Sequence, residues 1–139
     1  MFGLALPPAR CYWLVPVSTR ILILDDQPSL AGAAALLVAM FGYEPVQCHL
    51  PAEAFTRLQA EPFDLLLTDY GMPRMTGLDV VEQLRQEGCA IPVVMMSGQA
   101  ARIDHLRARQ LGVTTILSKP FTMTELAAAL HSALGTAPA

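Results

Sequence analysis

The sequence predicts an α/β domain in which a doubly wound, five-stranded parallel sheet carries helices on both faces. From Arg20 onward, short apolar runs alternate five times with amphipathic stretches, which is the pattern of a parallel sheet with connecting helices. The runs are continuously apolar or β-branched, as expected for strands that are covered on both sides. At 139 residues, the chain is long enough for one such domain.

Four strands are predicted from clear apolar runs, and a fifth from a weaker one. The clear runs are Ile21 to Leu24, Leu65 to Leu67, Val93 to Met96 and Thr115 to Leu117. The weaker candidate, Pro45 to Cys48, would be the second strand. Its proline favours a place at the edge of the sheet.

Helices are predicted between the strands from apolar residues at helical spacing, and each apolar stripe is expected to face the core. The three stripes are Leu30, Ala33, Ala34 and Leu37; Leu78, Val81 and Leu84; and Leu126, Leu130 and Leu134. Pro28 suits the first turn of the first helix, and Thr122 with Glu125 forms a capping box before the last. Two less regular helices are expected from about Ala52 to Ala60 and from about Ala101 to Leu111.

Both ends of the chain are expected to lie outside the domain. Residues 1–19 are apolar but broken by prolines and by Arg10, with neither a run of the roughly 20 residues that span a bilayer nor a basic opening. We expect no membrane insertion, and an extension whose role stays open: a disordered arm, a misassigned start, or an arm that packs on a neighbour. The domain itself is expected over residues 20–135, followed by a frayed tail at 136–139.

Charge and cysteine content argue against several classes of protein. A hydrophobic fraction of 53% excludes disorder for most of the chain. A net charge of −3 with scattered basic residues argues against a direct nucleic-acid surface. Cys11, Cys48 and Cys89 lie far apart and lack metal-binding spacing, so a reducing, cytoplasmic setting fits best.

Polar residues stand at the points where four of the predicted strands end. They are Asp25 and Asp26, Asp69, Ser97 and Lys119. The carboxyl ends of parallel strands meet at one edge of the sheet, where such folds bind ligands. The sequence therefore predicts that these side chains form one cluster.

The predicted cluster suits metal-assisted phosphate chemistry. Three carboxylates repel one another unless a cation neutralises them. Mg²⁺ prefers oxygen ligands and often combines one or two carboxylates with phosphate oxygens. The ammonium of Lys119 and the hydroxyl of Ser97 could bind further phosphoryl oxygens, which completes a phosphoryl clamp.

Each of these residues also has a purely structural interpretation. Asp25 and Asp26 could cap the first helix, and Asp69, Ser97 and Lys119 could be ordinary turn or loop residues. Their common place at strand ends favours the functional interpretation. The three histidines are expected on the solvated surface: His49, His105 and His131.

Over about residues 20 to 135, the sequence resembles the response-regulator receiver domains of bacterial two-component signalling. An acidic pair alone is weak evidence, but four motifs in this order and at these separations are specific. They are Asp25-Asp26, Asp69-Tyr70-Gly71-Met72-Pro73 with Thr76-Gly77, Met96-Ser97-Gly98, and Ser118-Lys119-Pro120-Phe121. The resemblance implies a flavodoxin-like sheet with strand order 2-1-3-4-5.

The resemblance also implies a role for each motif. Asp69 would attack the phosphorus of a phosphohistidine and become an acyl phosphate. Mg²⁺ would be held by Asp25, Asp26, an Asp69 oxygen and the backbone carbonyl of Gly71, while Lys119 and Ser97 would bind phosphoryl oxygens. The Lys119-Pro120 bond would be cis, and Gly77 would relieve strain in the turn after Asp69.

The implied protein is a signalling domain rather than an enzyme. Its partner would be a histidine kinase or a histidine phosphotransfer protein, and its downstream target stays unknown. The chain could be a stand-alone receiver, or a piece of a hybrid kinase or longer regulator.

One position departs from the family pattern, and two others resemble positions that tune the lifetime of the phosphorylated form. Ile116 stands where the family usually has an aromatic residue that swings on activation, so we expect a smaller conformational change. Gly71 and Gln99 resemble positions that tune the lifetime of the acyl phosphate.

Two functions of other classes stay open. One is a Mg²⁺-dependent phosphohydrolase, which usually needs an acid two residues after its Asp nucleophile, where this chain has Gly71. The other is an unphosphorylated interaction or nucleotide-binding module, but no Gly-rich loop follows the first strand.

Overall fold

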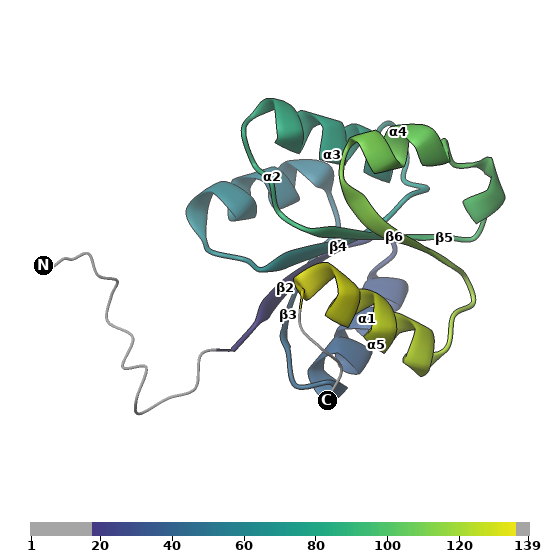
Figure 1. Cartoon of the computed structure of the whole chain (residues 1–139). Coiled ribbons are helices and arrows are strands. Elements are labelled where there is room, and N and C mark those ends of the chain that lie inside the picture. The colour runs from purple at the N-terminus through teal and green to yellow at the C-terminus, as the bar shows by residue number, and fades with distance from the viewer. Residues whose placement is uncertain (1–17, 136–139) are drawn as a thin grey trace, which may run out of the picture.

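A computed structural model describes residues 18–135 and shows one sheet between two layers of helices (Figure 1). The strands in chain order are β2 (Arg20–Leu24), β3 (Glu44–Cys48), β4 (Leu65–Asp69), β5 (Val93–Ser97) and β6 (Val113–Ser118). The helices are α1 (Pro28–Met40), α2 (Pro51–Ala60), α3 (Gly77–Gln86), α4 (His105–Gln110) and α5 (Met123–Leu134), with a 3₁₀ turn, η1 (Ala100–Arg102).

The sheet has the predicted topology. Its five strands are all parallel and lie in the order β3-β2-β4-β5-β6, which confirms the order 2-1-3-4-5 by position in the chain. The weak second strand is real and occupies an edge, where the missing N–H of Pro45 is tolerated. The strand order reverses between β2 and β4, so the carboxyl ends of these two strands flank the crevice where such sheets bind ligands.

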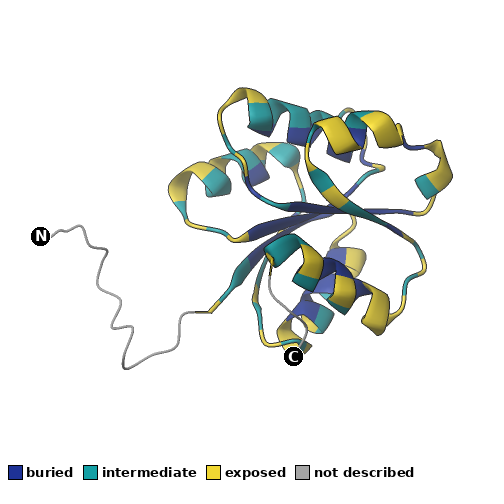
Figure 2. Cartoon of the chain, in the orientation of Figure 1, coloured by how far each residue is buried: buried dark blue, intermediate teal, exposed yellow. Residues whose placement is uncertain are grey.

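The core consists of two apolar layers, one on each face of the sheet. In Figure 1, α1 and α5 cover one face, and α2, α3 and α4 cover the other. Every residue of β4 and β5 is buried, and Figure 2 shows these strands as a buried sheet between helices that are exposed on their outer sides. Burial on both faces explains the continuous apolar runs.

The predicted core face of α1 is wrong in phase and correct only at Ala34. Its buried residues are Ala31, Ala34, Ala35 and Val38, whereas Leu30 and Ala33 are exposed and Leu37 is half-buried. The helix sequence, PSLAGAAALLVAM, is apolar almost throughout, so its periodicity does not identify the buried side. The sheet selects the small alanines because they allow the helix to approach closely.

The segment before β6 also differs from the prediction of one helix over about 101–111. It contains η1, a short irregular stretch, and then α4. Asp104 ends the irregular stretch as the N-cap of α4, and its side chain accepts the N–H of Arg107 at 3.0 Å. Asp104 therefore sets the start of this helix.

Capping boxes open two helices on opposite faces of the sheet. The predicted box of Thr122 and Glu125 is present at α5. A second box, which was not predicted, joins Thr76 and Asp79 at α3. Within residues 18–135, no helix is long and apolar enough to cross a membrane.

Arg85 forms hydrogen bonds that link the end of α3 to two loops, and its substitution is expected to destabilise the domain. Its guanidinium donates to the carbonyls of Leu111, Cys89 and Ile91 at 2.7, 3.0 and 2.8 Å. Because Arg85→Ala removes three donors from partly buried carbonyls, it should lower the free energy of unfolding by about 1–2 kcal/mol. Urea unfolding would measure this, with Arg109→Ala on the exposed side of α4 as the control. Equal effects of the two substitutions would contradict the role given to Arg85.

Candidate functional site

The carboxyl end of the sheet brings the predicted site residues together. Asp69 and Ser97 are the last residues of β4 and β5. Backbone bonds hold the next turns in place: Tyr70 N donates to Met96 O at 2.8 Å, and Lys119 N donates to Ser97 O at 2.8 Å. The site is thus built on the rigid ends of paired strands.

Three carboxylates converge at this edge. Asp25, Asp26 and Asp69 each offer an oxygen atom, and these atoms lie within 4.8 Å of one another. Asp25 and Asp69 are only 1% and 7% exposed, so little water screens their charges. Oδ1 of Asp26 is buried and has no hydrogen-bond partner among the described residues. An orphaned carboxylate oxygen beside two further acids is a donor set that fits a hard divalent cation.

Burial raises the pKa of Asp25 above its ordinary value of 3.8. The backbone N–H of Gln27 opposes this shift by donating to Asp25 Oδ1 at 3.0 Å, and the negative charge of Asp69 adds to it. Lys119 lowers the pKa of Asp25, and the charge of Asp26 raises it. Without a bound cation, the ionised form of Asp25 is therefore disfavoured in the folded protein.

This shift predicts a pH dependence for the metal-free protein. A raised pKa means that the folded state holds the proton more tightly than the unfolded state, so stability falls as the pH rises from 3.8 through the folded pKa. Asp25→Asn keeps an acceptor for Gln27 but carries no charge. In EDTA, the variant should gain stability relative to wild type over this pH range and be the more stable protein at pH 7. Urea midpoints at a series of pH values would measure it, and a constant difference would contradict the interpretation.

Lys119 is the cation of the described cluster. Its Nζ lies 2.7 Å from Asp69 Oδ1 and 3.7 Å from Asp25 Oδ2. The Lys119-Pro120 bond is cis, as expected. One ammonium group cannot neutralise three carboxylates, which leaves a net negative charge for a further cation to neutralise.

Ser97 lies beside the cluster, and its hydroxyl makes one hydrogen bond within the protein while it can still donate another. Its side chain is buried, and its Oγ accepts the N–H of Gln99 at 2.9 Å. A serine hydroxyl can accept and donate at once, so its hydrogen stays able to donate to another oxygen.

The two glycines after Asp69 have different surroundings. A Cβ on Gly71 would meet nothing within 4 Å, whereas a Cβ on Gly77 would lie 2.6 Å from the backbone oxygen of Asp69. Gly77 is the first residue of α3, and its N–H donates to Tyr70 O at 2.9 Å. The missing Cβ at Gly77 thus relieves a steric clash with the Asp69 backbone, which agrees with the expectation and shows its cause.

His49 is a site neighbour that the sequence interpretation missed. Its Nδ1 lies 3.1 Å from the backbone oxygen of Asp25, and its backbone N–H donates to Glu53 Oε1. The ring is half-buried rather than solvated. A usable signal was present, because His49 directly follows the end of β3 and so obeys the strand-end rule. His105 is exposed as expected, while half-buried His131 packs edge-to-face with Tyr43.

Ile116 lies in β6 on the face that carries α4. Its side chain is half-buried and lines a small hollow of about 270 Å³ with His105, Ala108 and Arg109 of α4. The smaller conformational change expected for an aliphatic residue here stays a prediction.

Comparison with known proteins assigns the chain to a family. The model of the response regulator receiver domain matches residues 21–131. The chain belongs to the response regulator receiver domain family. Two relatives of this receiver domain are the transcriptional regulatory protein KdpE of Mycobacterium tuberculosis and the alkaline phosphatase synthesis transcriptional regulatory protein PhoP of Bacillus subtilis. They are 31% and 26% identical to it over 84% and 85% of the chain. The chain spans about half the length of these relatives, 51% and 49%.

Solved structures share the fold of the receiver domain. Chemotaxis protein CheY4 of Vibrio cholerae superposes with a TM-score of 0.78 at 26% identity, over 85% of this chain and 100% of that one. Response regulator protein TrrA of Thermotoga maritima, in complex with Mg²⁺-BeF, superposes with a TM-score of 0.73 at 22% identity, over 81% of this chain and 96% of that one. These likenesses agree with the flavodoxin-like strand order.

Proposed function

We propose that Asp69 of this receiver domain accepts a phosphoryl group from the phosphohistidine of a histidine kinase or a histidine phosphotransfer protein. The observation that carries the proposal is the convergence of three carboxylates and Lys119 at the end of β4, with Lys119 Nζ 2.7 Å from Asp69 Oδ1. Membership of the receiver family supports the same chemistry.

In the proposed reaction, a carboxylate oxygen of Asp69 forms a bond to phosphorus while the P–N bond of the phosphohistidine breaks. The departing imidazole takes a proton from solvent. Lys119 then pairs with a phosphoryl oxygen, and the Ser97 hydroxyl donates to another. Asp25, Asp26, an Asp69 oxygen and the Gly71 carbonyl would hold Mg²⁺, which would supply positive charge for the phosphoryl oxygens.

The proposal makes the domain a phosphoacceptor switch rather than a turnover enzyme. Gly71 offers no second acid to act on the leaving group, as an Asp-dependent phosphohydrolase would need. We propose a cytoplasmic protein whose output passes through another protein or another segment. Direct nucleic-acid binding by this domain is not part of the proposal, since its net charge is −3.

Intact-protein mass spectrometry after treatment with acetyl phosphate tests the proposal. Wild type should gain the mass of one phosphoryl group in Mg²⁺, and should gain none in EDTA. Asp69→Asn should gain none under either condition. Asp104→Asn, which keeps a capping side chain and is not one of the three clustered acids, should behave as wild type. Labelling of Asp69→Asn, or no labelling of wild type where a known receiver is labelled, would overturn the assignment.

A further inference from the structure

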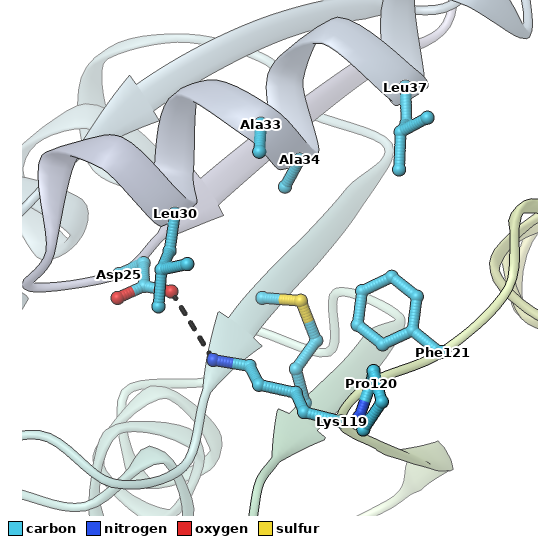
Figure 3. A pocket seen from close by; sticks show the side chains of 9 residues that line it. Asp25, Leu30, Ala33, Ala34, Leu37, Lys119, Pro120 and Phe121 are labelled. Atoms are coloured by element: carbon cyan, nitrogen blue, oxygen red, sulfur yellow. Dashed lines mark ion pairs between the residues drawn. The ribbon is translucent and has the colours of Figure 1, made fainter.

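An apolar groove runs along α1 beside the acidic cluster. It encloses about 510 Å³ (Figure 3). Leu30, Ala33 and Leu37 of α1 face Pro120 and Phe121 across it. One end is closed by the ion pair between Lys119 Nζ and Asp25 Oδ2, whereas the rest of the lining is almost entirely apolar.

The apolar surface continues from the groove along α1. This helix of 13 residues contains no charged side chain, although a surface helix normally has a charged or polar outer face. Leu36 and Met40, which are four residues apart, are 65% and 61% exposed. Helical spacing places both on the side of α1 next to Ala33, so they extend the groove toward the end of the helix. A continuous apolar surface of this kind usually marks an interaction site.

We propose that residues 1–17 of the same chain dock along α1 and in this groove. The segment is rich in apolar and aromatic residues, among them Phe2, Tyr12 and Trp13, and its single charged side chain is Arg10. Because it has no acid, nothing in it is repelled by the acidic cluster at the groove's end. Rigid aromatic side chains are suitable anchors for an apolar groove.

The point of attachment favours this occupant. Glu44 N donates to Thr19 O at 2.8 Å, and Tyr43 N donates to Val38 O at 3.2 Å. These bonds place Thr19 beside the carboxyl end of α1, where the exposed strip begins at Met40. Seventeen extended residues reach roughly 55 Å, whereas the 13 residues of α1 span about 20 Å. The segment can therefore follow the helix to the groove with length to spare.

Because residues 1–17 are covalently linked to the domain, a low intrinsic affinity for the groove is sufficient for docking. A tethered segment meets its site at a millimolar effective concentration, which a second copy of the chain in dilute solution does not reach. The inference goes beyond the proposed function and does not depend on phosphorylation.

Trp13 provides a direct test, because it is the single tryptophan of the chain. In wild type, its emission should be blue-shifted and its quenching by acrylamide several-fold weaker than for free tryptophan. Ala33→Glu places a charge in the groove at an exposed position, so it should shift the emission to the red and restore quenching. Leu106→Glu, on α4 at the other face of the sheet, is the control and should leave both unchanged. Circular dichroism would verify that both variants fold.

Two results would overturn the proposal. One is a Trp13 emission that is solvent-exposed in wild type and unaffected by Ala33→Glu. The other is a blue shift that appears only as protein concentration rises, together with a dimer in sedimentation equilibrium, because the groove would then bind a second copy. A blue shift independent of concentration, lost in Ala33→Glu and kept in Leu106→Glu, would support intramolecular docking.

Discussion

Gly77→Ala is expected to lower the free energy of unfolding by roughly 2–3 kcal/mol, although it adds one methyl group. The added Cβ would lie 2.6 Å from the backbone oxygen of Asp69 and 3.1 Å from Cα of Tyr70. Both obstacles are backbone atoms at the end of a buried strand, so neither can rotate away as a side chain would. Relief requires α3 and β4 to separate, which also displaces Asp69. Urea unfolding would measure the loss, and phosphorylation by acetyl phosphate should slow in the same variant.

Gly71→Ala is the matched control. It adds the same methyl group two residues after Asp69, where nothing lies within 4 Å and the backbone does not need a positive φ. Its stability should stay within about 0.5 kcal/mol of wild type, as for most surface substitutions. Equal losses in the two variants would show that the close approach at Gly77 is not the cause.

Asp26→Asn is expected to weaken Mg²⁺ binding by about tenfold or more, because it removes one charge from a cluster whose assembly needs a cation. Oδ1 of Asp26 has no partner in the described part of the chain, so the substitution breaks no internal hydrogen bond there. Without metal, the variant should therefore be at least as stable as wild type. Isothermal titration with Mg²⁺ would measure the affinity directly.

Stability gives a second measurement of the same effect. A ligand that binds only the folded state stabilises it by about 2.7 kcal/mol at a hundred times its Kd. Wild type should gain stability with Mg²⁺ concentration in this way, whereas Asp26→Asn should gain much less at the same concentration. Asp104→Asn is the control, since it removes an acid at the start of α4 and should respond as wild type does. An equal response in Asp26→Asn would exclude Asp26 as a ligand.

The sheet and its topology were predictable because the determining signals are local. Strands buried on both faces must be continuously apolar, and the runs in β2, β4 and β5 satisfy this requirement. Of the two edge strands, β3 was harder to predict, because only one neighbour selects its residues and Pro45 is allowed there. The order of the strands followed from the family resemblance rather than from the runs themselves.

The phase of α1 was not predictable from its own residues. When nearly all positions are apolar, spacing cannot distinguish the face that packs on the sheet from the face that lies along the groove. The buried set, in which alanines predominate, becomes clear only once the sheet is in place. The same near-uniform composition is what leaves Leu36 and Met40 exposed.

The candidate site was predictable as a set of residues but not in its finer contacts. Strand-end placement identified Asp25, Asp69 and Lys119, because parallel strands end at one edge. The contact of His49 with the Asp25 carbonyl, and that of Gly77 with the Asp69 carbonyl, join residues distant in sequence through backbone atoms. No side-chain pattern encodes contacts of that kind.

Lys119 belongs to two environments at once. Its stem lines the apolar groove, while its ammonium group lies against Asp69. A molecule that binds in the groove and favours one position of the Lys119 side chain would change the free energy of the ion pair between Lys119 and Asp69. By thermodynamic reciprocity, the charge state at Asp69 then alters the affinity of the groove by the same factor. A coupling of this kind would pass through Lys119 alone and would not require the sheet to move.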